Sequence, residues 1–183
     1  GTSSGVMVTD DGAFIGHLSA FSLLQVLNEK NIAAARDQNP LTKLPGNNMI
    51  HSYIAETLAD AGNGYLYIYF DFDNFKPFND RYGFRRGDRA ILLFSELLRE
   101  RASSCPLFIG HIGGDDFFAG CRADGLSDTA GMETLCERFS GAAASLYDRE
   151  DRERGGIVSR DRDGNERLFP LLSATCIVVR VGK

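Results

Sequence analysis

The sequence lacks an apolar run long enough to cross a membrane, and Gly1 to Gly5 have no signal-peptide character. It also lacks an excess of basic residues: 20 lysines and arginines face 25 aspartates and glutamates, for a net charge of −5. A surface that coats nucleic acid needs a basic face, so this balance disfavours it. We therefore expect no nucleic-acid partner and no membrane segment in this fragment. The missing initiator methionine indicates a piece of a longer protein.

Cysteine and histidine are scarce and are not spaced as zinc ligands. None of the four cysteines forms a CxxC pair; they are Cys105, Cys121, Cys136 and Cys176. We expect buried, reduced thiols and a cytoplasmic location. His17, His51 and His111 stand singly, which favours structural roles for them.

The chain is expected to divide near residue 38. Apolar residues 6–8 and 14–18 flank an Asp-Gly turn and predict a hairpin, and Ser19 is positioned to cap a helix over residues 21–36. Two strands cannot bury a core alone. We therefore interpret residues 1–38 as the end of a preceding domain with a connecting helix, and residues 39–183 as the main domain. The apolar stripe of this helix could pair with a second copy or pack back on its own domain.

Beyond residue 39 the apolar pattern alternates between helix and strand. A helix follows Pro40, and residues 65–70 read as a central strand because both faces are apolar or aromatic. A polar loop then leads to a helix opened by Asp88, a hairpin, a long helix capped by Ser127 or Asp128, and a strand over residues 171–181. Residues 148–167 read as a solvated excursion. This order predicts an α+β fold: a mainly antiparallel central sheet flanked by helices, in a split β-α-β arrangement.

The segment from His111 to Phe118, HIGGDDFF, predicts a hairpin with an acidic tip. Gly113 and Gly114 permit positive φ and carry no Cβ, so a ligand can lie directly on the main chain. The carboxylates of Asp115 and Asp116 repel each other unless a cation or a donor neutralises them. A Gly-rich turn with solvated acids is the ordinary alternative.

Asp71 ends the predicted central strand. If this strand and the hairpin are neighbours, Asp71 and Asp115 converge at one end of the sheet. Two carboxylates plus phosphate oxygens suit Mg²⁺, or Mn²⁺, and two such ions could clamp the attacking and leaving oxygens of a displacement at phosphorus. The alternative for Asp71 is a plain acid at a strand end.

These residues belong to a set of short blocks in a family order. The blocks are Phe70-Asp71-Phe72-Asp73-Asn74-Phe75-Lys76, Asn79-Asp80, Tyr82-Gly83, Gly87-Asp88 and Gly113-Gly114-Asp115-Asp116-Phe117. Together they resemble the GGDEF domain of diguanylate cyclases, over roughly residues 39–181. The upstream piece resembles the end of a CBS domain, as in proteins where EAL, CBS and GGDEF domains follow in sequence. The resemblance thus implies adjoining CBS and EAL domains in the parent chain.

The resemblance implies a metal site and a catalytic pair. Asp71 and Asp115 would bind Mg²⁺, with the main-chain carbonyl of Phe72 as a further ligand. Asp115 and Asp116 would be the catalytic acids.

The resemblance also implies a nucleotide site for GTP. Asn79 and Asp88 would hydrogen-bond the guanine base, because a carboxylate can accept from its N1 and amino groups. Lys76 would neutralise phosphate oxygens, and Gly113 and Gly114 would let the nucleotide lie against the hairpin. Taken singly, Asn79 reads as a turn former, Asp88 as an N-cap and Lys76 as a solvated charge.

In the family reaction two domains each present one GTP, and each 3′-hydroxyl attacks the other α-phosphate to give cyclic di-GMP. A homodimer is therefore implied for catalysis. Asp116, however, stands where active cyclases usually carry the longer glutamate, and misplacing a catalytic group by about 1 Å can cost on the order of 10²-fold. Three functions stay open: a diguanylate cyclase, a degenerate GTP-binding module that controls an attached EAL phosphodiesterase, and a structural dimerisation domain.

Other departures from the family concern its periphery. His111 replaces a common arginine, and Phe84 replaces the histidine expected after Tyr82-Gly83. The inhibitory RxxD motif is absent at residues 104–107, so we expect no product feedback there. The family's closing helix, with its phosphate-contacting basic residues, is not among residues 1–183.

Overall fold

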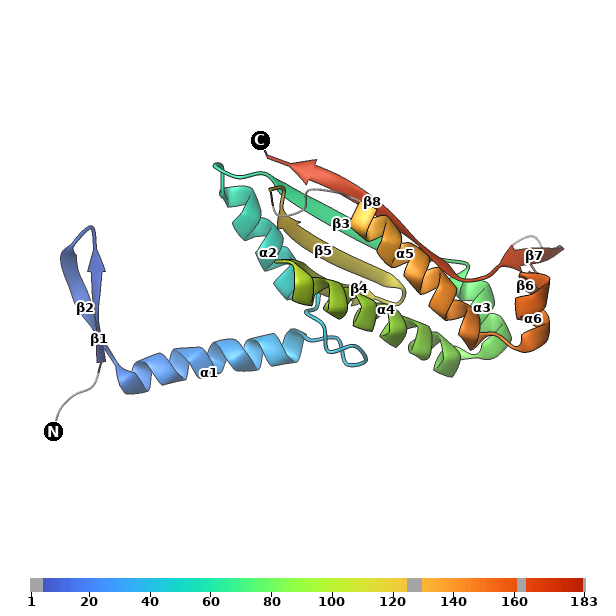
Figure 1. The fold of residues 1–183 in the computed structure, drawn as a ribbon. Helices are drawn as coiled ribbons and strands as arrows, with labels where there is room; N and C mark the ends of the chain where they lie inside the picture. The colour runs from blue at the N-terminus through green and yellow to red at the C-terminus, as the bar shows by residue number, and fades with distance from the viewer. Residues whose placement is uncertain (1–4, 125–129, 161–163, 183) are drawn as a thin grey trace. The chain divides into compact units, whose positions relative to one another are not determined.

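The computed structural model describes residues 5–124, 130–160 and 164–182 (Figure 1). Its contacts divide the chain into two compact units, Gly1–Gln38 and Asn39–Lys183. Within the described residues, no helix combines the length and the apolar character that a bilayer span requires. The two predicted caps of the long helix, Ser127 and Asp128, fall outside the described ranges.

The first unit is a hairpin followed by a helix, as the sequence predicts. Strands β1 (Gly5–Asp10) and β2 (Ala13–Ser19) pair antiparallel. Asp11 and Gly12 both have positive φ, 45° and 81°, which is the conformation of the type I′ turn that suits a two-residue hairpin. The Ser19 hydroxyl accepts from the Ser22 amide at 3.1 Å and so caps helix α1 (Ala20–Asp37).

The second unit contains a four-stranded sheet in which every pairing is antiparallel. Its strands are, in spatial order, β4 (Phe108–Gly113), β5 (Asp116–Arg122), β3 (Tyr65–Asp73) and β8 (Ser173–Val181). The strand read as central from its two apolar faces, β3, is indeed flanked on both sides. The predicted α+β class with a mainly antiparallel sheet is therefore confirmed.

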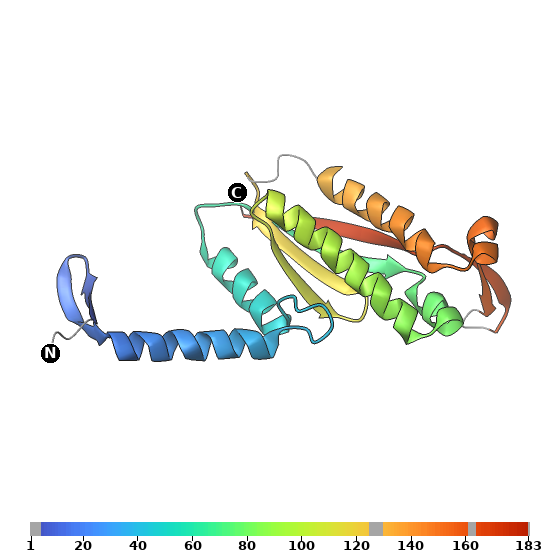
Figure 2. The same cartoon turned by 60° about the horizontal axis from the view of Figure 1, so that its bottom comes forward.

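Helices α4 (Phe84–Ser104) and α5 (Ala130–Ala143) cover one face of this sheet (Figure 2). Phe94 on α4 and Phe139 on α5 pack against Phe72 of β3, with ring centroids 5.2 and 4.5 Å apart. Helix α2 (Asn47–Ala59) lies against the opposite face, where Tyr53 stacks on Phe108 of β4 at 4.3 Å. The predicted apolar stripe of α5 is buried in this core.

Helix α3 (Phe75–Tyr82) occupies the segment that the sequence predicts as a polar loop, so that prediction was wrong. Phe75 and Phe78 lie three residues apart and both are buried, so core packing stabilises a helix whose average composition is polar. Gly83, with φ of 79°, separates α3 from α4. Helix α4 consequently begins at Phe84, and Asp88 is its fifth residue and not its N-cap.

The segment predicted as a solvated excursion is partly buried. After a 3₁₀ turn (Ala144–Leu146), it forms α6 (Arg149–Arg154) and strand β6 (Gly156–Arg160), and it leads into β7 (Glu166–Pro170), which pairs with β6. Asp151 is only 2% exposed because Tyr82, Arg81 and Arg154 all donate to its carboxylate. The alternation of acids and arginines therefore reflects a buried charge network as well as a solvated surface.

Candidate nucleotide and metal site

Two segments far apart in the sequence meet at one end of the sheet. In the β3–β5 register Phe70 faces Phe117, so Asp71 and Asp116 occupy the next pair of opposite positions. Asp115 precedes Asp116 at the tip of the β4–β5 hairpin. The structure thus brings the predicted acids of β3 and of the hairpin together.

The hairpin tip has the main-chain conformation that its glycines allow. Gly113 and Gly114 have φ of 153° and 58°, and the register of β4 is irregular just before Gly113. A Cβ built on either glycine would meet no other atom within 4 Å. The main chain of the tip is therefore open to a ligand, and the glycines are required by conformation and not by crowding.

The electrostatics of this cluster favour a cation. Partial desolvation and the charges of Asp115 and Asp116 raise the pKa of Asp71 to about 6. Burial and the charge of Asp116 likewise raise the pKa of Asp115. Both shifts show that the ionised carboxylates are disfavoured, first by burial and then by neighbouring negative charge, and a divalent cation would stabilise the ionised forms.

The donor set fits Mg²⁺ when a ligand completes it. Among the residues that the structure describes, no group of three or more His, Cys, Asp or Glu side chains could hold an ion. Phe72 is 3% exposed and its ring lies in the core, so its main-chain carbonyl is the only oxygen that it could offer next to Asp71. Two carboxylates and a carbonyl are hard oxygen donors, and phosphate oxygens are the usual partners that fill the octahedron of Mg²⁺.

Asp73 looks like Asp71 in the sequence but has a different environment. Its Oδ2 accepts from the hydroxyls of Ser173 at 2.8 Å and Thr175 at 2.9 Å, both on β8. Asp73 therefore ties β3 to β8. This role could not be predicted from the sequence, because the partners are about a hundred residues away in the chain.

The buried ring of His111 holds the hairpin tip. Its Nε2 lies 3.0 Å from the Gly114 carbonyl, which can only accept, so Nε2 donates and Nδ1 accepts from the Thr42 hydroxyl at 3.0 Å. The ring stacks on Phe117 at 4.4 Å and is 2% exposed, and this burial lowers the pKa of His111. His111 thus has a structural role, as expected: its ring holds the main chain of the acidic tip in place through Gly114.

The predicted base-binding residues lie where α3 and α4 meet. Asn79 on α3 has a buried Oδ1 to which none of the described residues donates a hydrogen bond, and a Cβ on Gly87 would lie 2.0 Å from it. Asp88 follows Gly87 on α4 and is exposed. The lack of a side chain at Gly87 therefore makes the space that the Asn79 amide fills, one residue before Asp88 in the chain.

Lys76 lies on the exposed surface of α3. Its Nζ pairs with Asp80 one turn later at 2.6 Å, and 80% of the side chain is exposed. An exposed pair of this kind contributes about 0.3–0.5 kcal/mol, so Lys76 is free to exchange Asp80 for another anion.

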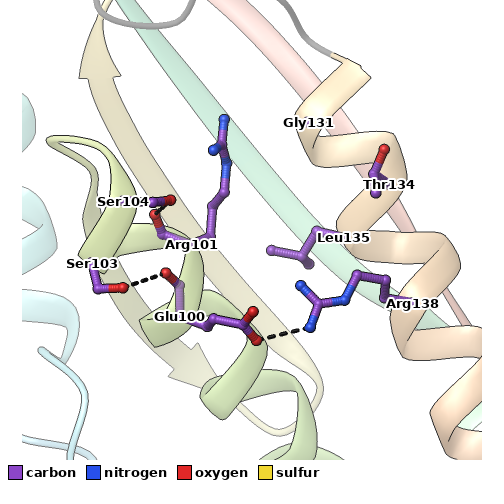
Figure 3. Close-up of a pocket in the computed structure, with 8 residues that line it drawn as sticks. All are labelled: Glu100, Arg101, Ser103, Ser104, Gly131, Thr134, Leu135 and Arg138. Carbon is purple, nitrogen blue, oxygen red and sulfur yellow. Dashed lines mark hydrogen bonds and ion pairs between the residues drawn. The ribbon is translucent and has the colours of Figure 1, made fainter.

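A separate cavity of about 400 Å³ lies between α4 and α5 (Figure 3). Arg101 and Arg138 line it, and Arg138 pairs with Glu100 across it at 2.8 Å. None of the predicted site residues lines this cavity.

Comparisons with known proteins identify the family of this chain. Residues 35–159 match the profile of the family described as "Diguanylate cyclase, GGDEF domain". A bifunctional diguanylate cyclase/cyclic di-GMP phosphodiesterase of Pseudomonas aeruginosa, MucR, is 29% identical over 117 residues. That match covers 62% of this chain, and the chain spans only 17% of the length of MucR.

Solved structures share the fold at low identity. The coiled coil and GGDEF domain of DgcB from Caulobacter crescentus, in complex with c-di-GMP, gives a TM-score of 0.58 at 18% identity, over 88% of this chain and 79% of that one. The diguanylate cyclase SiaD of Pseudomonas aeruginosa, in complex with its activator SiaC, gives 0.56 at 20% identity, over 88% and 57%. The GGDEF domain of FimX from Pseudomonas aeruginosa gives 0.54 at 12% identity, over 80% of both chains. Together with the family match, these observations show that the chain belongs to the GGDEF family of diguanylate cyclase domains, which act in cyclic di-GMP signalling.

Proposed function

We propose that this chain binds GTP with Mg²⁺ at the end of the sheet where β3 meets the β4–β5 hairpin. The observation that carries this proposal is the cluster of Asp71 with Asp115 and Asp116 beside an open glycine tip, where burial and then the charges of the two hairpin acids raise the pKa of Asp71 to about 6. Asp71, Asp115 and the Phe72 carbonyl would hold the metal, with Mn²⁺ as an alternative. When bound, the metal supplies Lewis-acid polarisation of the phosphate oxygens.

The guanine base is proposed to bind between α3 and α4. The partnerless Oδ1 of Asn79 is an acceptor, and the exposed carboxylate of Asp88 is a second acceptor one residue from Gly87. Guanine carries its donors, N1–H and the amino group, on one edge, so two acceptors select it over adenine. Adenine offers no matching pair of donors on this edge and would leave the buried Oδ1 of Asn79 unpaired, so we expect the site to prefer guanine.

The triphosphate is proposed to extend from the base site to the hairpin. Lys76 would leave its exposed partner Asp80 and pair with phosphate oxygens. Gly113 and Gly114 would let the phosphates lie on the main chain, because no Cβ stands in the way.

We propose that the reaction is nucleotidyl transfer between two copies of this domain. The 3′-oxygen of one GTP attacks the α-phosphorus of the other, the bond to the β-phosphate oxygen breaks, and pyrophosphate leaves. Two such steps convert two GTP into cyclic di-GMP and two pyrophosphates. Asp115 and Asp116 would act at the reacting phosphate, and a homodimer is required because each domain supplies one nucleotide.

A second candidate is a GTP-binding regulatory module without turnover. It is favoured by Asp116, whose side chain is one methylene shorter than the glutamate usual in active cyclases. Such a module would sit in the cytoplasm and pass nucleotide occupancy to adjoining CBS and EAL domains of a longer protein, with residues 1–38 as the end of the CBS part.

Isothermal calorimetry of GTP with and without Mg²⁺ tests the shared core of both candidates. We expect Mg²⁺-dependent binding of GTP that ATP does not reproduce, and we expect Asp71→Asn to abolish most of the Mg²⁺ dependence. Asp10→Asn makes the same chemical change in the first unit and should leave binding unaltered. Failure of the unchanged protein to bind GTP, or equal binding by Asp71→Asn, would overturn the proposal; product analysis of the same sample separates the two candidates.

A further inference from the structure

Tyr69 donates a hydrogen bond from its hydroxyl to Oδ1 of Asp116. The sequence gives Tyr69 no role beyond that of a strand residue. Its side chain is 39% exposed and shares the acidic end of the sheet with the residues proposed to bind Mg²⁺ and GTP.

The strand geometry explains why this tyrosine reaches this aspartate. Successive side chains of β3 alternate, so Tyr69 and Asp71 share one face while Phe70 points into the core. In the antiparallel register Tyr69 faces Phe118, and Asp116 lies one side-chain position farther along the same face of β5. This diagonal relationship spans about 7–8 Å between backbones, which an aromatic side chain bridges.

The hydrogen bond constrains a side chain that has little reach. The carboxylate of Asp116 has two oxygens. Tyr69 binds Oδ1, so Oδ2 is the oxygen that remains for interactions within the acidic cluster. The carboxyl of Asp116 does interact with that of Asp71. A phenol is also a neutral donor, so it fixes the carboxylate without adding a positive charge that would compete with a metal ion.

We propose that Tyr69 is a positioning residue that holds the carboxylate of Asp116 beside Asp71, in the orientation that the metal-bound nucleotide requires. This inference rests on the proposed function and deepens it. The bond fixes the orientation of an acid that is one methylene shorter than glutamate, and it leaves the difference in reach as it is.

Tyr67 provides a matched control on the same strand. It lies on the same face two residues before Tyr69, and its hydroxyl bonds the hydroxyl of Thr57 on α2 at 2.6 Å. Tyr67→Phe and Tyr69→Phe therefore remove the same atom from the same face, but only the second removes a contact with the acidic cluster.

The test measures the Mg²⁺ concentration that gives half-maximal GTP binding. Loss of one hydrogen bond to a charged group should raise this concentration about tenfold in Tyr69→Phe and leave it unchanged in Tyr67→Phe. Metal-free GTP binding and the melting temperature should be equal in the two variants. If Tyr69 acts through Asp116, adding Tyr69→Phe to Asp116→Ala, which leaves no acceptor for the phenol, should change nothing further.

Two results would overturn the inference: equal Mg²⁺ requirements in the two tyrosine variants, or fully additive effects in the double variant. The carboxyl ¹³C chemical shift of Asp116, measured without metal or nucleotide, separates this failure from failure of the proposed function. This chemical shift should change in Tyr69→Phe and remain unchanged in Tyr67→Phe. A protein in which the shift moves but GTP does not bind would refute the nucleotide site and retain the contact, whereas an unmoved shift would refute the contact itself.

Discussion

The buried carboxylate of Asp151 accepts a hydrogen bond from the hydroxyl of Tyr82 at 2.5 Å, although 69 residues separate the two in the chain. Tyr82 ends α3, the helix that carries Lys76 and Asn79, and Asp151 lies on α6. The contact therefore fixes the far end of the helix that we propose binds the nucleotide.

We expect Asp151→Asn to lower the free energy of unfolding by about 1.5 kcal/mol, because the buried carboxylate accepts charge-assisted hydrogen bonds that a neutral amide weakens, while Arg81 and Arg154 stay partly solvated. Denaturant unfolding measures this loss. Asp148→Asn is the matched control, since Asp148 pairs with Arg86 at 2.9 Å but is 58% exposed, and its loss should cost below about 1 kcal/mol. Equal effects of the two variants would contradict the network.

The same network predicts a pH dependence in acid. Hydrogen bonds from Tyr82 and then Arg81 hold the pKa of Asp151 below its ordinary value of 3.8. The unfolded chain therefore takes up this proton at a higher pH than the folded one does. The contribution of Asp151 is fully present above pH 3.8 and is lost as the pH falls through the lowered pKa, so the stability gap between Asp151→Asn and the unchanged protein should close in that range.

Gly87→Ala should weaken GTP binding, because its new Cβ would lie 2.0 Å from Oδ1 of Asn79. The Asn79 amide must move, and the base loses an acceptor; we expect about tenfold weaker binding with the Mg²⁺ dependence retained. Gly141→Ala makes the same change on α5, where no atom lies within 4 Å of the added carbon. It should be neutral or slightly stabilising, because alanine favours helix over glycine. Unaltered GTP affinity in Gly87→Ala would argue against base binding at this junction.

His111 should make the protein less stable as the pH falls below neutrality. Burial lowers the pKa of His111 from its ordinary value of 6.5, so the unfolded chain binds a proton first. The contribution of the neutral His111 ring to the free energy of unfolding is fully present above pH 6.5, and it declines as the pH falls toward the lowered pKa. His111→Gln, which retains a donor for Gly114, should flatten the dependence of the urea midpoint between about pH 5 and about pH 7. His51→Gln, on the exposed surface of α2, should leave the slope as it is, and a slope unchanged in both variants would contradict the assignment.

Asp116→Glu should raise cyclic di-GMP synthesis if the domain is a slowed cyclase. Restoring one methylene corrects a displacement of about 1 Å, which can be worth on the order of 10²-fold in rate. Product formation from GTP, measured at equal GTP occupancy, gives the answer, and Asp10→Glu controls for the added methylene. No gain in synthesis, with GTP still bound, would select the regulatory module instead.

The sequence predicted those parts of the fold that depend on local periodicity. The two apolar faces of residues 65–70 identified the central strand, and the apolar stripe of α5 is buried as expected. Gly113 and Gly114 marked a hairpin because few other residues adopt their φ values. The family blocks named the acids that the structure brings together.

The sequence did not predict α3, since its helix depends on burying Phe75 and Phe78 in a core made by other segments. It could not distinguish Asp71 from Asp73 either, because the hydroxyls that bind Asp73 lie on β8. The contact of Tyr69 with Asp116 and the burial of Asp151 likewise join segments far apart in the chain.

The order of residues by itself determined which segments become strands and helices and which acids stand at their ends, because backbone periodicity and glycine conformation are local properties. Only the tertiary structure decided which of those acids meet each other, which meet a donor and which meet solvent. Hydrogen bonding and desolvation depend on neighbours that the folded core selects.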